Sequence, residues 1–456
     1  MIKKLRAGLD RLPDLVASPR VRESSLQVLP FWVAGALTGL VAVGYAKAFV
    51  ILEQHFNTVS LESPWMLFVI PPLAFLGSWA LVVMFSPEAS GSGIPQLMAA
   101  TTPSVDAPIV HRLLSIRAAI VKVLSSCLAV AGGGAIGREG PTLQISGAIF
   151  RAVQVRLPAF WPRVPMSSMV LAGGAAGLAA AFNTPLGGIV YVIEELSRTH
   201  IGAFRSGVLH AVLVAGIVSQ VVLGPYLYLG FPRLGVWTNQ ELPWCALMGA
   251  LAGLVGSLWS RGLFSVVRFR ARLSTIRQEA GFALACGAVL SILVVLAGRG
   301  TMGSGRGVIE DLLFQTTEPA GAGLVIGRLA GSFVSFAAGG AGGVFAPALA
   351  SGAALASALA PAFSTVEPRL LIVLGMVGFL TGVTRTPFTS FVLVLEMTDR
   401  HSALFPMMIA AMSAYATSHL VDHESFYERV RATILAAESP APKGHEEARQ
   451  RLKATA

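Results

Sequence analysis

The chain has 456 residues, of which 54% are hydrophobic and only 13% are charged, and its mean hydropathy is +0.68. Because soluble domains carry about 25% charged residues, this composition excludes an ordinary water-soluble enzyme or binding module. The net charge of +10 does not indicate nucleic-acid binding either, since that would need a folded soluble module and none is evident.

The first part of the chain predicts a cytoplasmic start followed by membrane-spanning helices. Residues 1–28 contain two Lys and four Arg and lack the apolar centre of a signal peptide. The positive-inside rule places this basic segment in the cytoplasm. Apolar segments at 28–46, 65–85 and 281–298 approach or reach the ~20 residues that a helix needs to cross a bilayer. The sequence therefore predicts a polytopic α-helical membrane protein.

Other apolar segments are short and are interrupted by Gly and Pro. They lie at 140–153, 184–196, 341–359 and 385–397, in a chain with 48 glycines and 26 prolines. Such interruptions are tolerated at membrane depth only where they are buried in protein or line a cavity. These segments are therefore expected to surround a pathway.

Two of the interrupted regions match each other. AGGGAIGREGPTLQISGA and AAGGAGGVFAPALASGAA superpose at an offset of 206 residues, which aligns Pro141 with Pro347 and Glu139 with Phe345. NTPLGGIVYVIEE and RTPFTSFVLVLEM match at an offset of 202. Matching broken segments in the same order are typical of a duplicated transporter fold. The sequence leaves open whether the halves are inverted or parallel.

This repeat defines the predicted domain organisation. A membrane domain at 29–437 divides into halves at about 29–225 and 240–437. Its last amphipathic segment is SFYERVRATILAAE at 425–438, and the polar tail at 438–456 is too short for a regulatory domain.

Glycine and proline also mark the starts of several helices. GSGIP spans 91–95, GREGP spans 137–141 and GVFAP spans 343–347, and a fourth start lies near Tyr427. A helix start presents unpaired N–H groups and the positive end of the helix dipole, which favour an anion. If these starts converge, they form an anion site without a fixed positive charge, from which a small ion can be released.

The motifs GSGIP, GREGP and GGVFAP, in this order, resemble the signature motifs of the CLC chloride channel and transporter family. FNTPLGGIVYVIEE and LVLEMTD resemble CLC sequence too, and the similarity covers roughly residues 30–437. Within the family, the chain resembles the bacterial chloride/proton exchangers. It implies an all-α membrane fold of two repeated halves with tilted and broken helices, a homodimer, chloride as the transported ion and no cofactor.

The resemblance also implies the residues that bind the anion. Ser92 and Tyr427 correspond to the two hydroxyl ligands, although Tyr415 also lies in the C-terminal region. The backbone of the three motifs corresponds to the rest of the anion cradle: Gly91, Gly93, Ile94, Gly140, Val344, Phe345 and Ala346. Arg138, Pro141 and Lys122 are expected to support the site structurally.

Two glutamates correspond to the family's proton-handling residues. Glu139 matches the gating glutamate, whose carboxylate occupies an anion position when ionised and leaves it when protonated. A structural ion pair with Arg138 is the alternative. Glu195 matches the internal proton acceptor that exchangers carry and channels generally lack, with Glu194 as a competitor for the role. Glu396, the repeat partner of Glu194, is expected to be structural.

The chain departs from the family pattern after the first motif. Gln96 and Met98 stand where some bacterial exchangers have acidic residues, so Lys122 is expected to lack a carboxylate neighbour on that helix. Ser92 and Glu195 are the residues at which the fluoride-exporting branch typically differs, so chloride is favoured over fluoride.

The sequence therefore predicts a secondary active chloride/proton antiporter in a prokaryotic cytoplasmic membrane. A passive, proton-gated chloride channel of the same family is the alternative, and a membrane scaffold is a third possibility. The sequence contains no Ser/His/Asp set, Walker-type loop or dinucleotide fingerprint, so no enzyme is predicted. Its eight histidines and three cysteines show no metal-ligand spacing.

Overall fold

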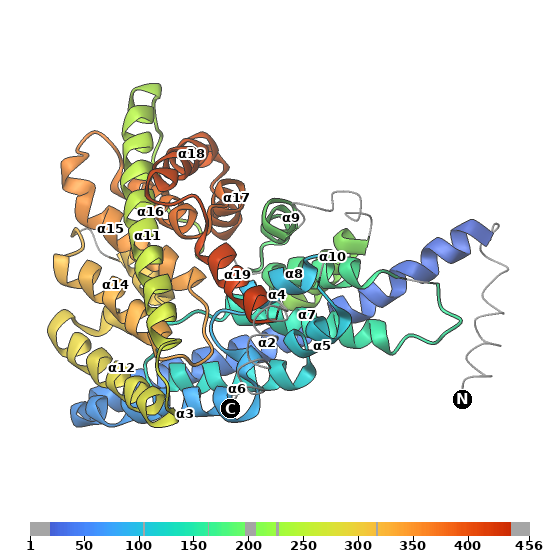
Figure 1. Ribbon diagram of the computed structural model, residues 1–456. Helices are drawn as coiled ribbons and strands as arrows, with labels where there is room; N and C mark the ends of the chain where they lie inside the picture. The colour runs from blue at the N-terminus through green and yellow to red at the C-terminus, as the bar shows by residue number, and fades with distance from the viewer. Residues whose placement is uncertain are drawn as a thin grey trace, which may run out of the picture.

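The computed structural model describes residues 19–438 except 104, 163, 197–206, 225–227 and 316–317. The described chain is built from helices (Figure 1). The first of them are α2 (Pro19–Glu62), α3 (Ile70–Phe85), α4 (Ile94–Thr101), α5 (Ala107–Leu113), α6 (Ile116–Ala131), α7 (Glu139–Val155), α8 (Met166–Phe182), α9 (Pro185–Tyr191) and α10 (Gly207–Leu223).

The later helices are α11 (Leu242–Arg270), α12 (Ile276–Ala297), α13 (Arg306–Glu310), α14 (Ala322–Ala337), α15 (Phe345–Leu359), α16 (Pro368–Thr384), α17 (Pro387–Thr398), α18 (Leu404–Val421) and α19 (Phe426–Glu438). Single turns connect them: η2 (Pro64–Phe68), η3 (Pro87–Ala89), η4 (Val192–Leu196), η6 (Asn239–Glu241), η7 (Arg299–Thr301), η8 (Asp311–Gln315), η9 (Ala360–Ala362) and η10 (His401–Ala403). Of these, η4 and η8 are π-helical.

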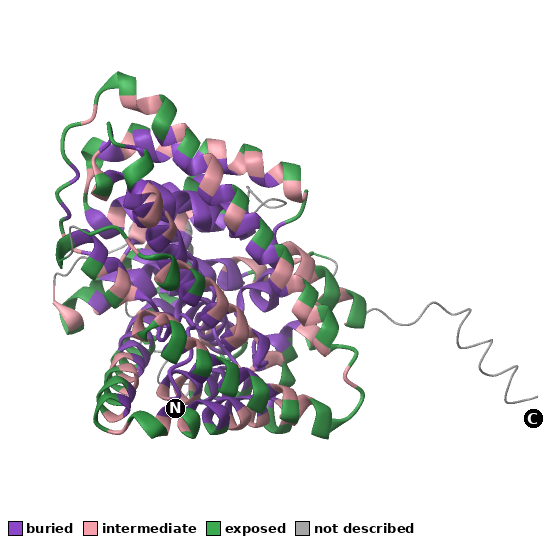
Figure 2. Cartoon of the chain, turned by 90° about the vertical axis from the view of Figure 1, so that its left-hand side faces the viewer, coloured by how far each residue is buried: buried purple, intermediate pink, exposed green. Residues whose placement is uncertain are grey.

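The helices confirm a multi-pass membrane protein. Seven described helical segments are long and apolar enough to cross a bilayer: Leu26–Glu62, Pro64–Phe85, Ala107–Ala131, Asn239–Arg270, Ile276–Ala297, Phe345–Ala362 and His401–Val421. Many large apolar side chains on these segments are exposed, such as Leu73, Ile120 and Leu296. Exposed residues lie on the outside of the molecule and buried ones in its centre (Figure 2). An apolar exterior of this kind suits lipid rather than water.

Helices α8 and α16 occupy the centre of the fold. All residues from Met169 to Phe182 and from Leu370 to Thr384 are buried. A helix that is apolar on all sides is expected to be enclosed by other helices, and α16 indeed packs against α11, α15, α17 and α18. Small residues permit this close approach.

Each central helix ends at an identical local break. Asn183 and Arg385 adopt the left-handed conformation, with φ of 58° and 61°, and each is followed by a Thr-Pro pair that starts α9 or α17. The residue before a proline disfavours helix, and proline itself suits the first helical position. The interruptions predicted at 184–196 and 385–397 are therefore real breaks between helices.

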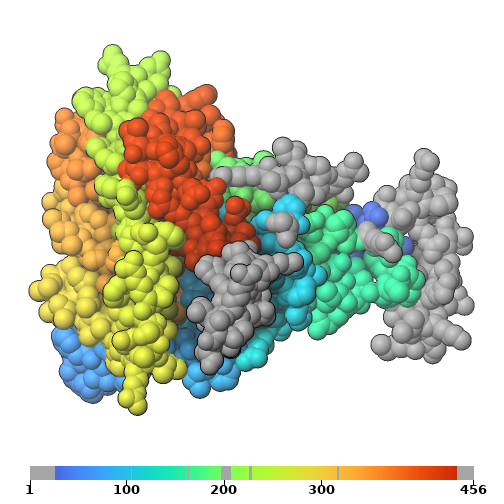
Figure 3. Space-filling model, in the orientation of Figure 1, coloured from blue at the N-terminus to red at the C-terminus, as the bar shows by residue number. Residues whose placement is uncertain are grey.

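The helix bounds repeat at the offsets found in the sequence. α6 and α14, and likewise α7 and α15, begin 206 residues apart, whereas α8 and α16, and α9 and α17, begin 202 apart. The earlier and later helices also interleave: α3 packs against α12, and α19 crosses to pack against α4. Figure 1 and Figure 3 show α19 reaching from the second group of helices to the first.

Helices α15 and α16 cross at a pair of glycines, and this crossing gives a test of the packing. A Cβ atom on Gly375 would lie 2.5 Å from the carbonyl oxygen of Gly352 and still closer to Ala356. We expect Gly375→Ala to lower the free energy of unfolding by about 1–3 kcal/mol because of overpacking, measured by thermal unfolding in detergent.

Gly281 on α12 provides the matched control. A Cβ atom at this position would meet no other atom within 4 Å. We expect Gly281→Ala to change stability by less than ~1 kcal/mol, with helix propensity favouring alanine. Equal destabilisation by both substitutions would contradict the packing described for Gly375.

Candidate functional site

Two hydrogen-bonded loop pairs bring the signature motifs together. Gly91 donates to the carbonyl of Gly340 at 2.9 Å and accepts from the N–H of Gly342 at 3.0 Å. Gly137 and Gly343 exchange both main-chain hydrogen bonds, at 2.8 and 2.7 Å. These contacts form two isolated β-bridges. The N-termini of α4, α7 and α15 therefore converge, as the motifs predicted.

Glycine is required at these loops because the backbone segments approach closely. Gly91 and Gly93 have φ of 65° and 98°, a region that glycine adopts without strain. A Cβ atom on Gly140 would collide with the hydroxyl and carbonyl oxygens of Ser92. Gly93 and Ile94 begin α4, Gly140 lies in the first turn of α7, and Val344, Phe345 and Ala346 begin α15.

Two buried hydroxyl groups lie at this convergence. Ser92 is 2% exposed and Tyr427, at the start of α19, is fully buried. The Tyr427 hydroxyl lies near that of Ser92, and apart from each other neither has a hydrogen-bond partner among the described residues. The ring of Phe345 stacks on that of Tyr427, with 6.2 Å between centroids and 13° between planes. Since buried polar groups are nearly always satisfied, these hydroxyls are suited to an anion.

Glu139 is buried at the start of α7, with 1% of its surface exposed. The N–H groups of Ala346 and of Glu139 itself face its carboxyl group, which also lies beside Gly137. Its Oε2 atom has no hydrogen-bond partner among the described residues. The carboxyl group thus lies at the N-terminus of α15, where the helix dipole favours a negative charge. It lies where the loop amides of the site converge.

The cations near the site do not neutralise Glu139 directly. Lys122 is fully buried and donates to the carbonyl oxygens of Gly91 at 2.9 Å and Ser90 at 3.3 Å. Gln96 donates to the same Ser90 carbonyl at 2.8 Å. No ion pair joins Arg138 to Glu139 in the described structure, and Arg138 instead lines a cavity next to it. Pro141 is buried in the first turn of α7.

The neighbouring glutamates Glu194 and Glu195 have different surroundings. Glu194 accepts from the N–H groups of Phe388 at 3.0 Å and Thr389 at 2.7 Å, so it caps α17. Glu396 does the same for α9, accepting from Leu186 at 3.0 Å and Gly187 at 2.6 Å.

Glu195 is the buried member of the pair. It is 4% exposed on the π-helical turn η4. Both Glu195 and Glu139 act electrostatically on the Tyr427 hydroxyl. The π-helical turn orients consecutive glutamates differently, so Glu194 serves as a cap while Glu195 faces the protein interior.

Two cavities lead toward the convergence. One of about 380 Å³ reaches Glu139 and is lined by residues of α2, the loop before α7, and α13. The other, of about 360 Å³, reaches Gly91 and Ser92 between α11, α14 and α19. The site thus has one approach to its glutamate and a separate one to its serine.

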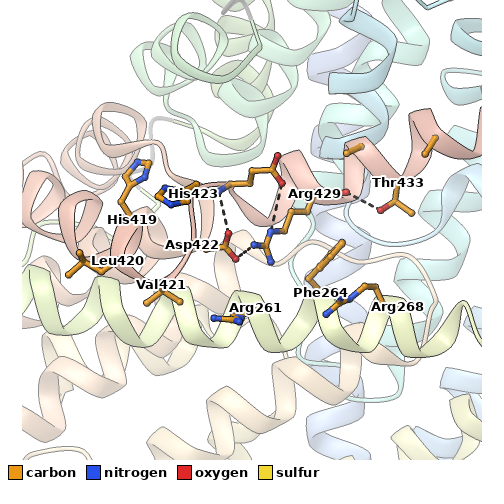
Figure 4. Close-up of a pocket in the computed structure, with 13 residues that line it drawn as sticks. Arg261, Phe264, Arg268, His419, Leu420, Val421, Asp422, His423, Arg429 and Thr433 are labelled. Atoms are coloured by element: carbon orange, nitrogen blue, oxygen red, sulfur yellow. Dashed lines mark hydrogen bonds and ion pairs between the residues drawn. The ribbon is translucent and has the colours of Figure 1, made fainter.

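A further cavity, of about 730 Å³, lies away from this site (Figure 4). Arg261, Arg268 and His419 line it, and Arg429 pairs there with Asp422. None of the predicted site residues lines this cavity. Within the described residues, no group of histidine, cysteine and acidic side chains could hold a metal ion.

The fold and site define a multi-pass membrane protein whose helix N-termini surround two buried hydroxyl groups and a buried carboxyl group. The family model described as "Voltage gated chloride channel" matches residues 73–419. The chain belongs to this family, which confirms the resemblance seen in the sequence motifs.

Similar proteins and structures agree with this assignment. The chain is 29% identical to an H(+)/Cl(-) exchange transporter ClcA of Vibrio campbellii, over 87% of each chain. It is 29% identical to ClcA of Salmonella agona, over 89% of this chain and 88% of the relative.

Two solved structures are similar in fold. A slow cyanobacterial Cl−/H+ antiporter has a TM-score of 0.80 at 22% identity, covering 90% of this chain and 98% of that one. A eukaryotic CLC transporter has a TM-score of 0.75 at 25% identity, and the match covers 89% of this chain and 74% of that one. The all-helical fold predicted from the sequence is thereby confirmed.

The structure also shows a residue that the sequence analysis did not select. Glu53 on α2 lines the same cavity as Glu139 and Arg138. The sequence feature that could have found Glu53 is a carboxylate after a long apolar run. Ionisable residues in membrane-spanning segments are costly and often functional. Nothing in the neighbouring sequence indicates what Glu53 contacts.

Proposed function

We propose that this protein is a secondary active antiporter that exchanges chloride for protons. The observation that carries the proposal is the pair of buried hydroxyls of Ser92 and Tyr427, which apart from each other have no hydrogen-bond partner among the described residues, beside the buried carboxyl group of Glu139. The names of the ClcA relatives as H(+)/Cl(-) exchange transporters support it.

Chloride binding follows from the groups at the convergence. The hydroxyls of Ser92 and Tyr427 donate to the ion, and the backbone around the starts of α4, α7 and α15 supplies further N–H groups. Lys122 donates to carbonyl oxygens rather than into the site. Because no fixed cation faces the ion, binding is weak enough for release and turnover.

Glu139 couples chloride to protons by competition. The amides at the start of α15 hold its carboxylate as they would hold an anion. Once protonated, Glu139 no longer competes for these amides, so it moves toward the 380 Å³ cavity and chloride takes its place. Deprotonation toward the opposite side returns the carboxylate and displaces chloride.

Glu195 is proposed as the internal proton acceptor. It is buried, and it lies in electrostatic range of the Tyr427 hydroxyl together with Glu139. Glu194 has both carboxylate oxygens engaged at the start of α17, which favours Glu195 over its neighbour. The alternative function is a passive chloride channel in which Glu139 gates the pathway and Glu195 carries no protons.

Proton movement driven by chloride tests the exchange. In liposomes with purified protein, a chloride gradient is expected to drive protons uphill. Glu139→Gln and Glu195→Gln should each abolish proton movement, because a carboxylate is lost, while chloride still crosses. Glu194→Gln is the matched control and should retain proton movement. Chloride flux without proton movement in the unmodified protein would establish the channel instead.

The anion site is tested by chloride binding in detergent. Tyr427→Phe removes one donor to the ion, so we expect about 10-fold weaker chloride binding by titration calorimetry. Tyr415→Phe is the control, because Tyr415 packs against His419 on α18 and should bind chloride as the unmodified protein does. Equal chloride affinity in all three proteins would remove Tyr427 from the site.

The chain organisation is part of the proposal. Two repeated halves at about 29–225 and 240–437 form the membrane domain, supported by the offsets of 206 and 202 residues between their helices. Residues 1–28 and 438–456 are a basic cytoplasmic segment and a polar tail. The function is transport rather than enzymatic catalysis, with chloride and protons as substrates.

The assembly is proposed to be a homodimer in a prokaryotic cytoplasmic membrane. The family resemblance and the bacterial relatives support this proposal, and the basic residues of 1–28 support a cytoplasmic N-terminus. The mass of the detergent-solubilised protein by light scattering, corrected for detergent, is expected to be twice the 47.6 kDa of one chain. A mass of one chain would contradict the dimer.

A further inference from the structure

A second carboxylate, the half-buried Glu53, lies in the cavity that reaches Glu139. The cavity is lined by Glu53 from α2, Arg138 and Glu139 at the start of α7, and Arg306 and Glu310 of α13. The arrangement places a fixed carboxylate in the space that the side chain of Glu139 enters when it leaves the start of α15.

The position of Glu53 is fixed by a rigid turn. The Ser304 N–H donates to Oε1 of Glu53 at 2.9 Å, and the Ser304 hydroxyl lies 3.3 Å from both carboxylate oxygens. Arg328 holds the same turn from α14 by donating to the carbonyls of Met302 at 2.8 Å and Gly303 at 3.1 Å. These bonds hold the Glu53 carboxylate at the cavity wall.

The charges around Glu53 define its electrostatic effect. Arg138 and Arg328 attract its carboxylate, Arg138 also attracts that of Glu139, and Glu53 repels Glu139. Arg306 is engaged elsewhere, because it pairs with Glu310 at 2.7 Å and lies over the Tyr228 ring at 4.9 Å. Repulsion between Glu53 and Glu139 thus acts inside the cavity, where water screens it less than at an open surface.

We propose that Glu53 is a positioning residue that admits Glu139 to the outer cavity only as the neutral acid. The inference rests on the proposed exchange. An ionised Glu53 opposes a second carboxylate in the cavity, so Glu139 leaves the amides of α15 after it has gained a proton. A hydronium ion in the cavity water gives its proton to a Glu139 carboxylate oxygen: one O–H bond breaks in the hydronium ion, which leaves water, and one O–H bond forms on Glu139. Glu53 in this way prevents chloride from crossing without a proton.

Removing this charge should loosen the coupling. In liposomes with equal pH on both sides, we expect Glu53→Gln to lower the number of protons moved per chloride. We also expect the pH of half-maximal flux to move down by about 1 unit, because an ionised Glu139 is then tolerated in the cavity. Glu53→Asp, which keeps the charge, should restore the coupling.

Gln54 and Glu310 provide matched comparisons in the same cavity. Gln54→Glu adds a carboxylate to an exposed position of the cavity wall, so it should move the pH of half-maximal flux upward. Glu310→Gln also removes a negative charge and leaves Arg306 unpaired, but Glu310 is not among the groups that act on Glu139, so it should move the pH of half-maximal flux by less than Glu53→Gln does.

The outcomes separate this inference from the proposed function. A purely structural role of Glu53, as partner of the Arg328 turn, predicts lower thermal stability with an unchanged pH profile and coupling. That result would overturn the proposal. So would a change in the pH of half-maximal flux by Glu53→Gln that persists when Glu139 is also replaced by Gln. If Glu53→Gln does not fold, the proposal is overturned when Gln54→Glu leaves the pH of half-maximal flux unchanged. Absence of chloride-driven proton movement in the unmodified protein would instead refute the exchange itself.

Discussion

The pairing of glycine-rich loops is the contact on which the rest of the site depends. Gly91 bonds to the 340–342 segment, and Gly137 bonds to Gly343. Helix N-termini leave unpaired N–H groups that a bilayer cannot satisfy, so three of them can be gathered inside the membrane only where other backbone surrounds them. The two β-bridges supply that backbone, and they set the positions of Ser92, Glu139 and Phe345.

The site combines amides and hydroxyls while directing cations elsewhere. Lys122 donates to the carbonyl oxygens of Ser90 and Gly91, so its charge stabilises the loop that presents Ser92. Arg138 lines the cavity beside Glu139 and forms no ion pair with it in the described structure. The electric field at the site therefore arises from many partial charges spread over helix ends. This field requires only that the bound group be small and negative. The carboxylate of Glu139 meets that requirement as an anion does, so it can take the place of an anion.

Features that depend on local sequence were predictable, and those that depend on distant contacts were not. The breaks at Thr184-Pro185 and Thr386-Pro387, and the glycine-marked helix starts, follow from backbone preferences within a few residues. Whether Glu194 or Glu195 faces the interior depends on α17, almost 200 residues later. Glu53 shows the same limit, because its partner Ser304 lies 251 residues away. A single sequence carries no signal for such pairs.

The reciprocal caps of α9 and α17 have a consequence for a chain that holds only one of these helices. Glu194 caps the helix that carries Glu396, and Glu396 caps the helix that carries Glu194. Neither helix has a complete N-terminus without the other. A single copy of this unit would be left with uncapped amides and a bare carboxylate in lipid. A chain with only one of the two helices would therefore need a second copy of itself to complete both helix starts.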